Sequence, residues 1–124
     1  LHKEYRRQRQ MCIRDSHLGM WRAARRLVVD TYVEAERIVA DGGELTVDMR
    51  ADMRIAATYA TEACREVAQW AHLASGTTAI REGSRLERAF RDLYTGTQHA
   101  FISEKTYIDS ATVKLGLVDN NRGL

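Results

Sequence analysis

The chain has 124 residues, of which 29% are charged, with 19 lysines and arginines, 17 aspartates and glutamates, two cysteines and no proline. This length suits one domain with a modest core, and two cysteines exclude a disulfide framework. No apolar run approaches the roughly 20 residues that span a bilayer, and no secretory segment is evident. We therefore expect a cytoplasmic protein that does not bind membranes.

The positive charge is concentrated at the start of the chain. Residues 1–16 hold five of the lysines and arginines but only two acidic residues, and the remainder is nearly neutral. The string "YRRQRQMCIRDS" has neither a helical stripe nor strand alternation, and it is similar to translated sequencing adapters. We expect residues 1–16 to be an artefactual or disordered segment. A basic disordered arm and a nucleic-acid-binding tail are the alternatives, but no interleaved aromatic pattern favours a nucleic acid as partner.

A long helix is predicted from about Leu18 to Ala40, because apolar residues recur at steps of three and four. Its predicted buried face is formed by Met20, Ala24, Leu27, Val28, Thr31, Ala35, Ile38 and Val39. Asp41-Gly42-Gly43 ends this helix, since glycine readily adopts the left-handed conformation that follows a helix C-terminus.

A second helix is predicted from just after Thr46 to Ala74. Thr46 is a suitable N-cap, and Asp48 in the first turn interacts favourably with the helix dipole. The predicted buried face consists of Met49, Met53, Ala56, Ala60, Ala63, Cys64, Val67, Ala71 and Ala74. Because many of these side chains are small, a neighbouring helix can approach closely.

Two shorter helices are predicted after a connector at residues 77–83. Ser84 and Glu87 form the pattern of a capping box at the start of the third helix, which is expected to bend or end around Gly96. The last helix is predicted over about Ser103 to Leu117, and a polar tail follows at residues 119–124. The buried face of the last helix is predicted to contain Tyr107, Ile108, Ala111 and Leu115.

These elements predict an all-α fold, a partial up-down helical bundle, with one helical domain at residues 17–118. The periodicity by itself is equally compatible with a non-enzymatic helical interaction domain. Neither a His-Glu-x-x-His nor a Cys-x-x-Cys string occurs, so no metal site is predicted.

Four short strings follow one another in the second half of the chain: Gly76-Thr77-Thr78, Leu86-Glu87-Arg88, Phe90-Arg91-Asp92 and Gln98-His99. In this order they resemble the last part of the C-terminal helical domain of the acyl-CoA dehydrogenase superfamily, and especially the branch that holds the dehydrogenase-type flavin monooxygenases. The resemblance covers residues 45–117 well and residues 17–41 loosely. It implies a fragment of a larger flavin-dependent oxidoreductase, inactive by itself.

The resemblance assigns cofactor-binding roles to Gly76, Thr77, Thr78, Arg91 and Gln98. Backbone amides and hydroxyls near a helix start are suitable donors to a phosphate, although a Gly-Thr-Thr turn is also an ordinary helix end. The implied cofactor is FAD, with FMN as the alternative. The implied assembly is a homo-oligomer, a dimer or tetramer, in which this connector approaches a flavin held mainly by a neighbouring subunit.

His99 is the predicted catalytic residue. Imidazole titrates nearest to neutral pH, which suits proton transfer, although a lone histidine is more often structural. Acyl-CoA dehydrogenases often carry a catalytic glutamate in a Tyr-Glu-Gly-Thr string after the Arg-Asp pair, whereas this chain has His99 and Ala100 there and no carboxylate before Glu104. The resemblance therefore favours hydroxylation of a small molecule, with reduced flavin from a separate reductase, over oxidation of an acyl-CoA.

Overall fold

The computed structural model describes residues 2–124, except for the side chains of residues 2, 5–7, 9 and 10. It contains the helices α1 (His2–Ala40), α2 (Val47–Ala74), α3 (Arg85–Gly96) and α4 (Glu104–Lys114), with a short 3₁₀ helix, η1 (Gly76–Thr78), after α2. No strand occurs in residues 2–124. The predicted all-α class is confirmed.

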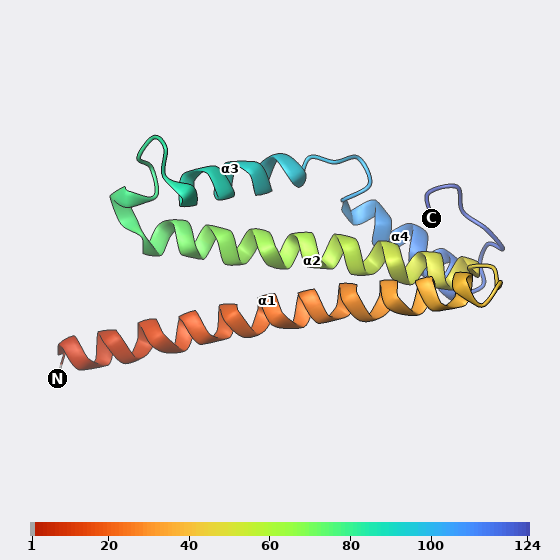
Figure 1. Ribbon diagram of the computed structural model, residues 1–124, viewed down its shortest axis with the longest axis horizontal. Helices are drawn as coiled ribbons and strands as arrows, with labels where there is room; N and C mark the ends of the chain where they lie inside the picture. The colour runs from red at the N-terminus through yellow and green to blue at the C-terminus, as the bar shows by residue number, and fades with distance from the viewer. Residues whose placement is uncertain (1) are drawn as a thin grey trace.

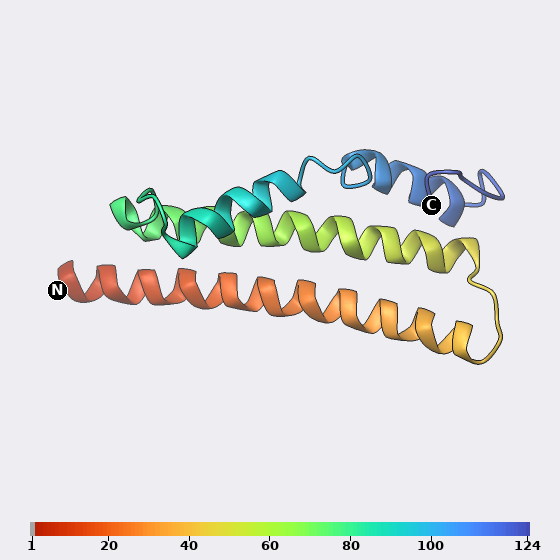
Figure 2. The ribbon, with the colours of Figure 1, turned by 45° about the horizontal axis from the view of Figure 1, so that its top comes forward.

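The helices are arranged around α2, which packs against each of the other three (Figure 1). α1 and α2 form a long antiparallel hairpin. α3 runs back along the opposite side of α2, and α4 follows it toward the start of α2, so that α3 and α4 lie end to end (Figure 2). The central helix therefore has two packed sides, one facing α1 and one facing α3 and α4.

The hairpin is closed by the predicted cap residues. Gly42 has a φ of 80°, and the amides of Gly42 and Gly43 donate to the carbonyls of Val39 and Ile38 at 3.0 and 2.9 Å. These two bonds form a Schellman motif, which satisfies carbonyls that the end of α1 would leave unpaired. At the start of α2, Thr46 Oγ1 accepts a hydrogen bond from the Met49 amide at 3.1 Å. The predicted bounds of α2 are thus confirmed.

The core is built from small side chains. The buried apolar residues are Ala24, Ala35, Ala51, Ala56, Ala63 and Ala79, and the buried polar residues are Thr58, Thr106 and Ser110. Small residues let helix backbones approach closely, but each contributes little apolar area. Many large apolar side chains consequently stay partly or largely exposed, including Leu27 at 40% and Val39 at 55%, both of which were predicted to be buried.

α1 begins much earlier than the predicted start near Leu18. Residues 2–17 contain no glycine or proline and are rich in arginine and glutamine, so the helix continues through them at little cost. Its first turns extend past the end of α2 (Figure 1). The described side chains before Ile13, namely Lys3, Glu4, Gln8, Met11 and Cys12, are exposed. The interpretation of residues 1–16 as an artefactual or disordered segment stays a prediction.

The predicted buried face of α4 is wrong. Ile108 and Leu115 are 64% and 73% exposed, whereas Thr106 and Ser110 are buried against α2. The reason is that polar side chains join the two helices: Tyr107 Oη donates to Glu62 at 2.7 Å, and Lys114 pairs with Asp52 at 2.8 Å. An apolar periodicity does not detect an interface of this kind.

The tail after α4 turns back onto the fold. The Asn120 side chain accepts from Arg50 of α2 at 3.3 Å, and the Asn121 side chain accepts from the Gly123 amide at 2.8 Å. Residues 119–124 are therefore polar, as predicted, but they have specific contacts near the start of α2.

Candidate functional site

The connector after α2 is a tight turn with exposed polar groups. Ser75 caps α2, and Gly76 has a φ of 55°, which favours glycine. The Ala79 amide donates to the Gly76 carbonyl at 3.1 Å, and Ala79 is fully buried. Ala79 thus anchors the turn, while Thr77 and Thr78 are exposed. Both threonines are available to a ligand that approaches from outside.

A groove of about 590 Å³ lies beside α3. Its floor contains an aromatic row in which His72 lies 4.3 Å from Phe90 and Phe90 lies 4.4 Å from Tyr94, measured between ring centroids. Arg91 and Gln98 also line this groove. It combines flat apolar surfaces with a cation and an amide, which is the composition expected of a ligand site.

Arg91 is held by its own helix. Its Nη1 atom lies 3.1 Å from Glu87 Oε1, and the Arg91 side chain remains 64% exposed. Ser84 Oγ accepts from the Leu86 amide at 3.3 Å, and Glu87 pairs with Arg91. The capping box predicted at Ser84 is therefore only half formed, because the carboxylate of Glu87 has a charged partner one turn ahead.

His99 lies in the turn that follows α3, outside the lining of the groove. The His99 amide donates to the Gly96 carbonyl at 3.2 Å, and the His99 carbonyl accepts from the Ile102 amide at 2.8 Å. Its imidazole is exposed, and Nδ1 accepts from the Phe101 amide at 3.3 Å. The other ring nitrogen, Nε2, is therefore the one that can exchange a proton with a ligand or with water.

Arg54 on α2 holds this turn, a role that no motif in the sequence predicts. Its Nη2 atom donates to the Phe101 carbonyl at 3.0 Å, and its Cζ atom lies 4.5 Å from the centre of the Phe101 ring. The signal that could have found it is the pair Arg50 and Arg54, which are four residues apart in a helix that is otherwise rich in alanine. Two arginines on one face of a helix indicate that hydrogen-bond acceptors from other parts of the fold lie against that face.

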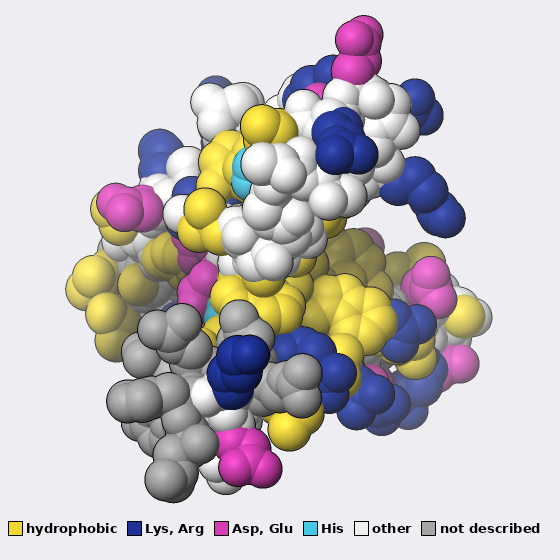
Figure 3. Space-filling model, turned by 90° about the vertical axis from the view of Figure 1, so that its left-hand side faces the viewer, with side chains coloured by type: hydrophobic (Ala, Val, Ile, Leu, Met, Phe, Trp, Pro, Cys, Tyr) yellow, Lys and Arg dark blue, Asp and Glu magenta, His cyan; other side chains and the backbone are white. Residues whose placement is uncertain are grey.

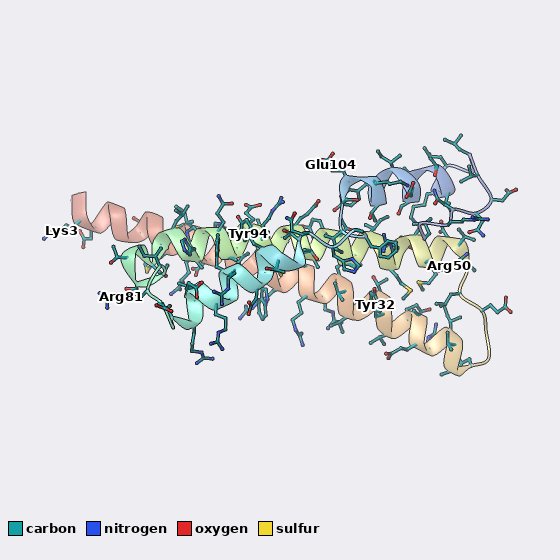
Figure 4. The ribbon with its side chains drawn as sticks, turned by 90° about the horizontal axis from the view of Figure 1, so that it is seen from above. Lys3, Tyr32, Arg50, Arg81, Tyr94 and Glu104 are labelled. Carbon is teal, nitrogen blue, oxygen red and sulfur yellow. The ribbon has the colours of Figure 1, made fainter. Side chains whose placement is uncertain are left out.

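The predicted site residues thus fall into three groups along one side of the molecule. The structure brings Arg91 and Gln98 together in the groove, whereas Gly76, Thr77 and Thr78 lie beyond one end of α3 and His99 lies beyond the other. Arg81, Tyr94 and Glu104 mark this order in Figure 4.

Residues 2–124 contain neither a membrane-spanning helix nor a cluster of metal-binding side chains among those described. None of the helices there is both long enough and apolar enough to cross a membrane. The described histidine, cysteine, aspartate and glutamate side chains do not gather in a group of three or more that could hold a metal ion.

Residues 16–104 match the family model described as "Acyl-CoA dehydrogenase, C-terminal domain". The chain belongs to this family. Two relatives of this acyl-CoA dehydrogenase C-terminal domain are the indole-3-acetate monooxygenases of Pseudomonas putida and Acinetobacter baumannii. The first is 33% identical over 95 residues, or 77% of this chain and 24% of the relative. The second is 34% identical over 76 residues, or 61% of this chain and 20% of the relative.

The acyl-CoA dehydrogenase C-terminal domain therefore spans about a quarter or less of the curated relatives it matches. No solved structure matches the chain. The matched residues 16–104 include every residue that was predicted for the site, from Gly76 to His99.

Proposed function

We propose that this chain is the C-terminal helical part of a flavin-dependent monooxygenase that hydroxylates a small aromatic acid, with indole-3-acetate as the first substrate to test. The observation that carries the proposal is the 33% identity to an indole-3-acetate monooxygenase over 77% of the chain. The residue pattern supports it, because His99 stands where acyl-CoA dehydrogenases often have a catalytic glutamate.

The residues of the domain fit one side of a flavin site. The aromatic row of His72, Phe90 and Tyr94 offers flat surfaces to a planar ring system. Arg91 offers an exposed cation, and the turn at Gly76–Thr78 offers exposed amides and hydroxyls to a phosphate. A bound flavin would supply the electron transfer and oxygen activation, and FAD is the form that we expect.

In this proposal Arg91 and Gln98 bind and orient the flavin, and His99 donates or accepts a proton. The exposed Nε2 of His99 can give a proton to, or take one from, a reacting group within hydrogen-bonding distance. The groove is open on this domain, so the other walls of the site belong to further parts of the enzyme or to a second subunit. Large exposed apolar side chains on the same chain support such contacts.

The test uses a full-length enzyme that carries this domain. Supplied with reduced flavin, oxygen and indole-3-acetate, it should form hydroxylated product. His99→Ala should leave flavin affinity largely intact, but product formed per oxygen consumed should fall, because a general acid or base typically contributes about 10²–10⁴-fold. Glu36→Ala, at an exposed position of α1 outside the lining of the groove, is the control and should leave the yield unchanged.

Oxidation of an acyl-CoA is the second candidate, favoured by the name of the matching family. It predicts that an acyl-CoA bleaches the oxidised flavin rapidly without oxygen, and that His99→Ala has little effect on the rate. Stopped-flow absorbance under anaerobic conditions distinguishes the two functions. Such bleaching, unaffected by the substitution, would overturn the monooxygenase proposal.

A further inference from the structure

Phe101 is the centre of a small network beside His99. Its amide donates to His99 Nδ1 at 3.3 Å. Its carbonyl accepts from Arg54 Nη2 at 3.0 Å and from Thr106 Oγ1 at 3.0 Å. The centroid of the Phe101 ring lies 4.5 Å from Arg54 Cζ and 5.6 Å from the centroid of the His99 ring. One residue thus links an arginine of α2 to the predicted catalytic histidine.

The arginine that holds Phe101 lies on the helix at the centre of the fold. Arg54 lies on α2, which packs against all the other helices, and it is 47 residues from Phe101 in the sequence. Thr106, the second donor to the same carbonyl, is 2% exposed. The other backbone bonds of the segment at residues 97–103 are local: its first three amides donate to carbonyls of the last turn of α3, and the Ile102 amide donates to the His99 carbonyl. Arg54 and Thr106 therefore fix the position of the Phe101 carbonyl, and with it the backbone of Phe101, relative to the bundle.

The amide on the other side of the Phe101 Cα atom decides which nitrogen of His99 carries the proton. A backbone amide can only donate, so Nδ1 must accept, and neutral His99 then has its proton on Nε2. His17 has the opposite arrangement, because its Nδ1 lies 2.7 Å from the Ile13 carbonyl, which can only accept. The two histidines are expected to be opposite tautomers within one chain.

We propose that Arg54 is a positioning residue for His99. By holding the Phe101 carbonyl and stacking on the Phe101 ring, Arg54 keeps the Phe101 amide in place to donate to Nδ1, so that the proton of neutral His99 is on Nε2. The catalytic meaning of this arrangement depends on the proposed function, but the tautomer and its dependence on Arg54 do not.

The first experiment measures imidazole nitrogen shifts and amide exchange by NMR on the 124-residue chain. In the unchanged protein His99 should be the Nε2–H tautomer and His17 the Nδ1–H tautomer. Arg54→Gln should give a mixed tautomer at His99, and exchange of the Phe101 amide should be about tenfold faster, as expected for the loss of one hydrogen bond. His17 should not change.

Arg50→Gln is the matched control, since Arg50 lies one turn earlier on α2 and bonds to Asn120 of the tail. It should leave His99 and the Phe101 amide unchanged. Arg54→Lys should keep part of the preference of His99 for the Nε2–H tautomer. An ammonium group can donate to the Phe101 carbonyl, but it does not stack on the ring as a flat group. If Arg54→Gln prevents folding, Thr106→Val removes the other donor to the carbonyl and should shift His99 in the same direction.

An Nδ1–H tautomer at His99 in the unchanged protein would overturn the proposal. So would a His99 signal that responds to Arg54→Gln no more than to Arg50→Gln. In the full-length enzyme Arg54→Gln should lower product formed per oxygen consumed, and it should have little further effect in a His99→Ala background. If His99→Ala itself keeps the full yield, the proposed function fails while the NMR result on the tautomer stands.

Discussion

The bond between Tyr107 and Glu62 is the clearest titratable link between α4 and α2. Burial of the phenol, together with the hydrogen bond to the Glu62 carboxylate, raises the pKa of Tyr107 to about 12. The unfolded chain has the ordinary tyrosine pKa of about 10. Because the folded-state pKa is the higher one, this group stabilises the fold fully below about pH 10, and the contribution is lost as the pH rises through about 12.

We predict that the free energy of unfolding in urea decreases between about pH 10 and 12 and that Tyr107→Phe removes part of this decrease. The phenylalanine variant should be less stable than the unchanged protein near neutral pH, since it leaves Glu62 without its phenol partner. Tyr32→Phe, at an exposed position of α1, is the control. Equal pH dependence in both variants would contradict the assignment.

At the scale of the element, α2 depends on its N-cap. Thr46→Ala removes the acceptor for the Met49 amide and should lower the free energy of unfolding by about 1 kcal/mol in a denaturant titration. Thr46→Ser keeps a hydroxyl and should cost much less. A Thr46→Ala protein as stable as the unchanged chain would show that water or another group caps the helix equally well.

The helices that the sequence predicted best are those whose ends have a chemical marker. Thr46 and the glycines at 42 and 43 define the loop between α1 and α2, and each acts locally. The start of α1 has no such marker, so its extension to His2 could not be seen from apolar periodicity. The face of α4 could not be predicted either, because it is determined by partners on α2, such as Glu62 for Tyr107, that are far away in the sequence.

The residues of the candidate site also divide into those that a local sequence pattern predicts and those that depend on distant contacts. His99, Arg91 and Gln98 were named from a pattern of residues close together in sequence. Arg54 could not be named in this way, because its role depends on a contact with Phe101, which is 47 residues away in the sequence. The separation of His99 from the groove was also unforeseen, since it follows from the end of α3 at Gly96 and the turn after it.

At the scale of the whole molecule, the first turns of α1 extend past the end of α2 (Figure 1). Deleting residues 1–12 should leave the midpoint of thermal unfolding nearly unchanged, whereas deleting residues 1–17 should lower it. The longer deletion removes the His17 ring, which stacks on Trp70 at 4.8 Å. Circular dichroism melts test both variants. A large loss from the shorter deletion would indicate a buried apolar side chain there, worth roughly 1.5–3 kcal/mol.

The exposed apolar surface should make the chain self-associate. An apolar groove of about 550 Å³ between α1 and α2 is lined by His17, Leu18, Trp21, Val67, Trp70 and Arg14. Figure 3 shows hydrophobic side chains exposed between the helices at this end of the molecule. A second exposed apolar pair consists of Ile108 on α4 and Leu115, which directly follows the last residue of α4. Exposed surfaces of this kind are association sites.

Light scattering should therefore detect species larger than a monomer. Replacing both Ile108 and Leu115 by lysine should shift the distribution toward the monomer, because the charges oppose burial of that face. Val33→Lys, at an exposed position of α1, should have less effect. A chain that is monomeric at all concentrations would contradict the prediction and weaken the case for subunit contacts through this domain.

Because α2 takes part in all three of the extensive helix-to-helix contacts, loss of any other helix exposes part of α2, and α2 cannot open unless the others have already separated. Amide hydrogen exchange measures such openings directly. Exchange should be slowest in the middle of α2, around Ala56 and Ala63, where it approaches the rate of global unfolding. The first turns of α1, which extend past the end of α2, should exchange within the shortest labelling times, and α3 and α4 should fall between these limits.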